Sequence, residues 1–82
     1  MKVKLPEDLT AMGIDTIAQL KKANKSKKLV EVTKIFPHPV SRYVFQFPYM
    51  YVARFDSGKR TTEYFIRPDG ELSRLTMSYT RV

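Results

Sequence analysis

The sequence predicts an α+β fold in which an N-terminal helix or broken helix pair packs on a four-stranded antiparallel meander. Apolar residues recur at helical spacing over residues 5–25 and alternate from residue 29 onward. Turn residues at 56–59 and 68–70 then separate strand-like segments. Because the helical part precedes the strands, the order is typical of an α+β protein. The chain of 82 residues is expected to form a single domain, residues 1–82.

The helical prediction depends on one mostly apolar stripe, which consists of Leu5, Leu9, Met12, Thr16 and Leu20. Pro6 suits the first turn of such a helix, because its missing N–H would be unpaired there in any case. Gly13 leaves two alternatives open. It either ends a first short helix, with Asp15 capping a second, or lies within one helix at a cost of about 1 kcal/mol. We favour the broken pair.

Four segments have the alternation of strands. They are residues 29–36, 41–55, 60–67 and 71–82, so that the antiparallel sheet is expected within residues 29–82. In the third segment, Tyr64 and Ile66 share one face and Phe65 lies on the other. In the fourth, Leu75, Met77 and Tyr79 share a face, which we expect to be buried while the polar face meets water.

The segment 41–55 holds aromatic residues at five consecutive odd positions, namely Tyr43, Phe45, Phe47, Tyr49 and Tyr51. An unbroken strand places all five rings on one face, but Pro48 favours a strand edge or a bulge. With a bulge, the core face carries Tyr43, Phe45, Phe47, Met50 and Val52, and the open face carries Tyr49, Tyr51, Ala53 and Phe55. Exposed tyrosines can stack on bases, whereas a core position is the more common role of strand aromatics.

Basic residues dominate the charge, with 15 Lys and Arg against 8 Asp and Glu and a formal charge of +7. This balance favours attraction to nucleic acid, acidic membranes or acidic proteins. Five lysines lie within residues 21–28, which form either a phosphate-binding arm or a solvated surface. The six arginines lie in the strand half, where they either bind phosphate or pair with neighbouring glutamates. The candidate nucleic-acid-binding residues are Lys21, Lys22, Lys25, Lys27, Lys28, Arg42, Tyr49, Tyr51, Arg54, Arg60 and Arg74.

Residue types needed for catalysis are scarce and scattered. The chain has no cysteine, which excludes disulfides and thiolate chemistry. Its one histidine, His38, lies between two prolines, and nothing marks Ser41 as its partner. No pair of carboxylates has a spacing typical of acid–base catalysis, and the three glycines lie in separate turns. We therefore expect no enzymatic activity, no metal and no cofactor.

These observations predict a small basic non-enzymatic protein that binds DNA or RNA electrostatically, with weak sequence preference. The alternative is a small protein-binding regulator or inhibitor, such as one from a phage or other mobile element, with an acidic partner protein. A homodimer through the open sheet face or a strand edge is a third alternative. No segment is apolar enough for a signal peptide or a span of about 20 residues, so we expect a cytoplasmic protein with no membrane partner.

Overall fold

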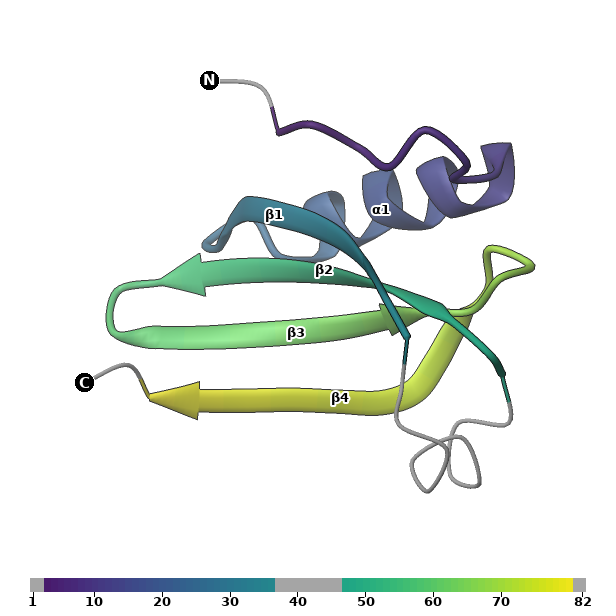
Figure 1. Cartoon of the computed structure of the whole chain (residues 1–82). Helices are drawn as coiled ribbons and strands as arrows, with labels where there is room; N and C mark the ends of the chain where they lie inside the picture. The colour runs from purple at the N-terminus through teal and green to yellow at the C-terminus, as the bar shows by residue number, and fades with distance from the viewer. Residues whose placement is uncertain (1–2, 37–46, 81–82) are drawn as a thin grey trace.

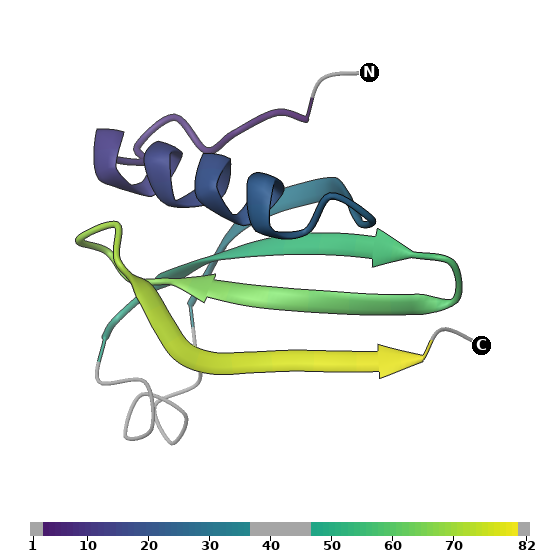
Figure 2. The same ribbon diagram turned by 180° about the vertical axis from the view of Figure 1, so that it is seen from behind.

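The computed structural model describes residues 3–36 and 47–80 and shows one helix followed by an antiparallel sheet (Figure 1, with the reverse side in Figure 2). Helix α1 spans Ala11–Ala23. Strands β1 to β4 span Lys28–Ile35, Met50–Ser57, Arg60–Ile66 and Leu72–Thr80. They form one sheet in the order β1-β2-β3-β4, with antiparallel neighbours. The predicted α+β arrangement is confirmed.

Helix α1 is continuous, so the predicted broken pair and the predicted start at residue 5 are wrong. The helix begins after Thr10, whose hydroxyl accepts a hydrogen bond from the Gly13 N–H at 3.1 Å. This N-cap satisfies a donor that the first turn leaves without a helical partner. Gly13 lies inside the first turn, and a Cβ there would meet Leu9 Cδ1 at 2.6 Å. Glycine at this position lets Leu9 pack closely against the helix.

The main hydrophobic core lies between α1 and the sheet. Figure 1 shows the helix across one face of the sheet, with β4 the strand farthest from it. We call the face toward α1 the inner face and the opposite one the outer face. The buried residues of this core are Leu9, Ile17, Leu20, Val32, Tyr51, Ala53, Phe55 and Ile66. Burial of such apolar surface contributes about 25 cal/mol per Å², which makes this core the main source of stability.

The aromatic segment divides between the two faces. Strand β2 begins at Met50, so Pro48 precedes the strand and takes no place in its ladder. Tyr49 and Tyr51 pack in the inner core, whereas Phe47 and Met50 belong to a smaller outer cluster with Phe65. This grouping is the one that the bulge alternative predicted, but that alternative placed the set of Met50 under the helices. The core position of Tyr49 and Tyr51 is the one that the unbroken-strand alternative predicted. Tyr43 and Phe45 lie outside the described residues.

The apolar side of β4 lies on the outer face and is not buried, contrary to the prediction. Met77 is paired with Glu63, and Tyr79 with Thr61, which places both side chains away from α1. Leu75, Met77 and Tyr79 are 40%, 53% and 41% exposed. The predicted faces of β3 are confirmed, because Tyr64 and Ile66 pack on the inner core and Phe65 on the outer cluster.

The phenol of Tyr51 provides a test of the inner core. Its hydroxyl donates a hydrogen bond to the Asp8 backbone carbonyl at 3.3 Å, and burial together with the nearby Asp8 raises the pKa of Tyr51 from 10.0 to about 12. Between these values the unfolded chain loses the phenol proton and the folded chain keeps it. Stability therefore falls as the pH rises from about 10 to about 12, by about 1.4 kcal/mol per unit of pKa difference.

We expect the Y51F variant to lose less stability than the original chain over this interval of pH. Urea unfolding at both ends of the interval measures the difference, because lysine titration is common to the two proteins. An equal loss in both proteins would show that Tyr51 ionises normally.

Candidate nucleic-acid interface

One end of the molecule gathers most of the lysines of the helical half. Strand β1 begins at this end, where Lys28 is paired with Asp56, and β4 finishes here, where Thr80 is paired with Arg60. The carboxyl end of α1 and the β2–β3 turn lie at the same end (Figure 1). We call this surface the basic end. It comprises Lys21, Lys22, Lys25, Lys27, Lys28, Lys59 and Arg60.

The connection between α1 and β1 is held against the sheet by specific hydrogen bonds. Asn24 caps the helix, with its backbone N–H and its side-chain amide both donating to the Leu20 carbonyl at 2.9 and 2.8 Å. The Tyr64 hydroxyl donates to Asn24 Oδ1 at 3.1 Å, and Lys27 Nζ donates to Thr62 Oγ1 at 3.2 Å. The lysine-rich connection is therefore anchored to β3 at two points, which fixes the positions of its charges.

Four ion pairs of the described residues involve none of the seven cations of the basic end. They join Lys34 to Asp8, Arg54 to Glu31, and Arg67 to Asp69 and Glu71. Strand pairing places Asp56 near the basic end, where its carboxylate accepts a hydrogen bond from the Thr61 hydroxyl at 2.9 Å. The basic end thus has seven cationic side chains, and the pairing of β1 with β2 places one carboxylate, that of Asp56, near them.

Acidic residues lie toward the opposite end. The β3–β4 turn carries Asp69 and Glu71, and it contacts the start of α1 through the Thr16 hydroxyl, which donates to the Gly70 carbonyl at 2.7 Å. Asp8 precedes the helix here, and the bonded ammonium of Lys34 lowers the pKa of its carboxyl below 3.8. These acids are paired with Lys34 and Arg67, so the positive charge of the described residues is concentrated at the basic end, and the field of the molecule directs a polyanion toward it.

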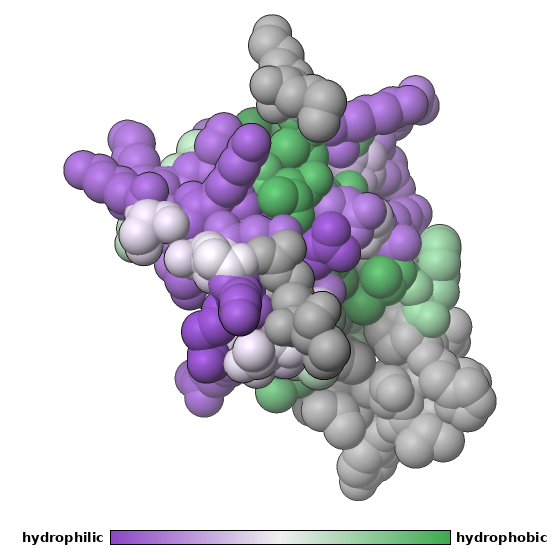
Figure 3. Space-filling model, turned by 90° about the vertical axis from the view of Figure 1, so that its left-hand side faces the viewer, coloured by the Kyte–Doolittle hydropathy of each residue, from purple (hydrophilic) through white to green (hydrophobic). Residues whose placement is uncertain are grey.

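A groove of about 670 Å³ runs along the basic end between α1 and the chain that precedes it. Four lysines, Lys21, Lys25, Lys27 and Lys28, contribute to its lining. The remaining lining is aliphatic and consists of Val3, Leu5, Ile14, Ile17, Ala18 and Leu29. Figure 3 looks onto this end and shows hydrophobic atoms (green) bordered by hydrophilic ones (purple). Such a groove offers cations for phosphates and no ring for base stacking.

The structure brings six of the predicted residues together and separates the others. Lys21, Lys22, Lys25, Lys27, Lys28 and Arg60 lie at the basic end. Arg54 lies in the middle of the outer face, 3.8 Å from Glu31, and Arg74 lies near the start of β4. Arg42 and His38 lie outside the described residues.

The two tyrosines do not form a stacking platform, which corrects the prediction made for them. Tyr51 is only 1% exposed. Tyr49 is half-buried, with its ring edge-on to Tyr51 at 5.9 Å and Lys34 Nζ 4.3 Å from its centroid. Both rings are occupied by the inner core because the strand turns this side toward α1. Sequence reasoning missed Lys59, which reaches the basic end through the pairing of β2 with β3.

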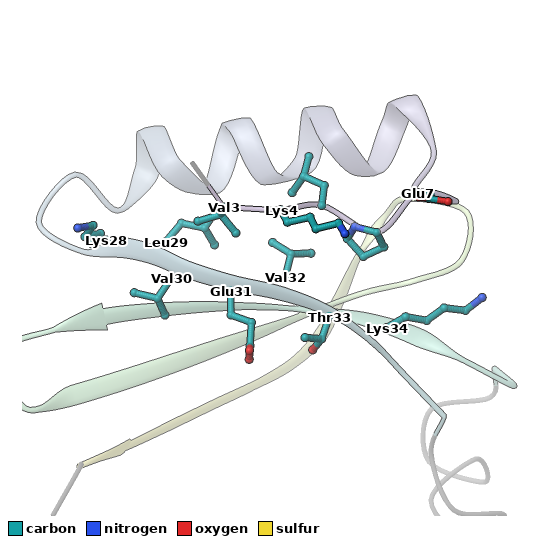
Figure 4. A pocket seen from close by; sticks show the side chains of 12 residues that line it. Val3, Lys4, Glu7, Lys28, Leu29, Val30, Glu31, Val32, Thr33 and Lys34 are labelled. Atoms are coloured by element: carbon teal, nitrogen blue, oxygen red, sulfur yellow. The ribbon is translucent and has the colours of Figure 1, made fainter. Parts of the chain in front are cut away.

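A second groove, of about 780 Å³, lies beside β1 (Figure 4). It separates β1 from the segment that begins at Val3. The charged residues lining it are of both signs, namely Lys4, Glu7, Lys28, Glu31 and Lys34. Glu7 and Glu31 lie apart in Figure 4 and do not form a carboxylate pair. Mixed charge makes this groove a poorer match for a polyanion than the basic end.

Comparison of the chain with family models, with curated proteins and with solved structures finds no match. Within residues 3–36 and 47–80, no helix combines the length and the hydropathy that crossing a bilayer requires.

Proposed function

We propose that this chain is a small non-enzymatic nucleic-acid-binding protein that holds the phosphate backbone at its basic end. The observation that carries the proposal is the clustering of seven cationic side chains, none of which belongs to the ion pairs of Lys34, Arg54 and Arg67. Lysine acts on phosphate as a point charge, and phosphate contacts carry no sequence information. Binding of this kind is electrostatic, with weak sequence preference.

The helix dipole does not cancel this charge. The carboxyl end of α1 carries about half a negative charge, which is favourable for Lys21 and Lys22 in the last turn. Half a charge is small beside seven cations, so the basic end keeps a strongly positive potential. The hydrogen bonds of Asn24 and Lys27 hold the connection in place, which reduces the entropy lost on binding.

The carboxylates have structural roles that support a non-catalytic protein. Glu31 lies beside Arg54, while Asp69 and Glu71 both contact Arg67. Asp69 also accepts a hydrogen bond from the Glu71 N–H at 3.0 Å, which shapes the β3–β4 turn. These contacts explain the positions of these acids by structural roles, with no need for a catalytic role.

A salt titration tests the proposal. We expect the protein to bind a generic single- or double-stranded oligonucleotide at ~50 mM salt, and the logarithm of the affinity to fall linearly with the logarithm of the salt concentration. The slope should be about −0.9 for each phosphate contact on double-stranded DNA. Fluorescence anisotropy measures both the affinity and its salt slope. An absence of binding at ~50 mM salt would contradict the proposal.

A protein-binding regulator is the second candidate, and the groove beside β1 favours it. An extended segment of a partner can lie in this groove, between β1 and the segment that begins at Val3, with apolar side chains against Val30 and Val32. Capture of a stoichiometric protein partner from nuclease-treated extract, with no binding to oligonucleotides, would favour this candidate over the first.

A further inference from the structure

Strand β4 is the less protected edge of the sheet, although its register with β3 shifts between the Tyr64–Thr76 and Ile66–Leu72 pairs. It spans nine residues, holds one charged residue, Arg74, and contains no proline. Natural proteins protect sheet edges with lysines, prolines, bulges or covering segments, because an exposed edge pairs with other strands. The other edge, β1, has such protection: a register shift after Leu29, the charged residues Lys28 and Lys34, and the N-terminal segment alongside it (Figure 4).

Strand β4 also carries an unusual amount of exposed apolar surface. The described residues include seven large hydrophobic side chains that are exposed, and four of them, Leu72, Leu75, Met77 and Tyr79, belong to β4. Met77 and Tyr79 lie on the outer face, and Leu75 shares their alternation along the strand. A free edge next to an apolar row is the combination that a partner strand covers.

We propose that a second copy of this chain covers β4, by antiparallel pairing of β4 with the β4 of the other copy about a two-fold axis at Met77. This register places Met77 opposite its own copy and Leu75 opposite Tyr79 of the other copy. The three exposed apolar side chains of each copy then form one continuous row. A self-complementary row of this kind is what a two-fold interface requires.

Charge favours a second copy in this orientation. Residues 75–80 are all uncharged, so the contact avoids the repulsion that a chain of formal charge +7 otherwise meets on self-association. Strand β4 follows Glu71 and finishes beside Arg60. Antiparallel pairing therefore turns the acidic turn of each copy toward the basic end of the other, whereas parallel pairing would bring the two basic ends together.

The register also keeps the Arg74 side chains of the two copies apart. In this register the two Arg74 residues lie six positions apart, or about 20 Å along the strand, which exceeds the screening length of about 8 Å at physiological salt. Each Arg74 is opposite Thr80 of the other copy. The two Arg74 side chains therefore do not meet across the pair.

Sedimentation of two methionine variants tests the proposal. Met77 and Met12 are 53% and 52% exposed, so M77K and M12K make the same change at equal exposure. At micromolar concentration we expect the original chain and M12K to sediment as dimers, with twice the 9.6 kDa of one chain, and M77K as a monomer. Circular dichroism checks that both variants are folded.

A cysteine at the same positions gives an independent readout. The chain has no cysteine, so oxidation of M77C joins two copies at the two-fold axis, whereas M12C stays monomeric on a denaturing gel. A monomeric original chain, or a dimer that M77K leaves intact, would overturn the proposal. A monomer that binds nucleic acid would leave the basic end in place and remove only the dimer.

Discussion

The variant E7Q/D15N/K25Q/K28Q is expected to bind nucleic acid on the order of 100-fold more weakly than the original chain near 0.1 M salt. Its formal charge remains +7, because two acids and two lysines are neutralised together. Because counterions are released on binding, each lost phosphate contact weakens the affinity roughly tenfold at this salt concentration. If overall charge controlled binding, the variant would bind normally. If the basic end controls binding, the variant binds as weakly as a chain that carries only the two lysine changes, K25Q/K28Q.

A matched pair of variants controls for the loss of charge. K25Q and R74Q each lower the formal charge by one, but only Lys25 lies at the basic end. Both side chains are exposed, and neither belongs to the ion pairs of Lys34, Arg54 and Arg67. We expect the salt slope to flatten by up to about one for K25Q and to stay unchanged for R74Q. Equal effects would favour overall charge.

Replacement of Gly70 by alanine is expected to destabilise the fold by about 3 kcal/mol. Gly70 has a φ of +92°, a conformation that costs about 1–2 kcal/mol for a residue with a Cβ. That Cβ would also lie 2.6 Å from the Gly13 nitrogen and 2.7 Å from Met12 Cβ. The turn would have to withdraw from α1, which breaks the hydrogen bond from Thr16 to the Gly70 carbonyl.

Gly58 provides the control for the steric part of this effect. Its φ is also positive, at +57°, but a Cβ there meets nothing within 4 Å. We expect G58A to cost about 1 kcal/mol, the conformational part alone. Urea unfolding of both variants measures the difference. Similar losses for G70A and G58A would show that the turn does not pack on α1 as closely as described.

Local signals predicted the order of the elements well. The turns near Gly58 and Gly70 follow from glycine and aspartate at fixed positions, and both glycines do adopt positive φ. The faces of β3 follow from alternation alone. The helix start was less predictable, because Thr10 and Pro6 both suit a helix start and only the N-cap hydrogen bond from Gly13 to Thr10 decides between them.

The covered face of the sheet could not be predicted from alternation. A period of two divides the β2 residues into two sets but does not say which set lies under the helix. Tyr49 and Tyr51 lie there because Tyr51 reaches the Asp8 carbonyl and packs with α1 residues, contacts between segments about 40 positions apart. Alternation also cannot distinguish a face that packs on the chain's own core from one that stays exposed, as on β4.

The candidate site was predictable only where its charges are adjacent in sequence. The lysine run at residues 21–28 is evident from composition, and it contributes five of the seven cations of the basic end. Lys59 joins them through the register in which Lys28 is paired with Asp56, two residues before the β2–β3 turn. A register between distant segments depends on the whole sheet, so no local pattern contains it.

The amide shifts of the labelled protein during titration with a generic oligonucleotide show directly whether the basic end binds phosphate. We predict that the perturbed amides cluster at residues 21–28 and 58–60, and that those at residues 12–15 and 67–71 stay in place. Shifts centred on the opposite end of the molecule, or spread evenly over its surface, would contradict a phosphate-binding role for the basic end.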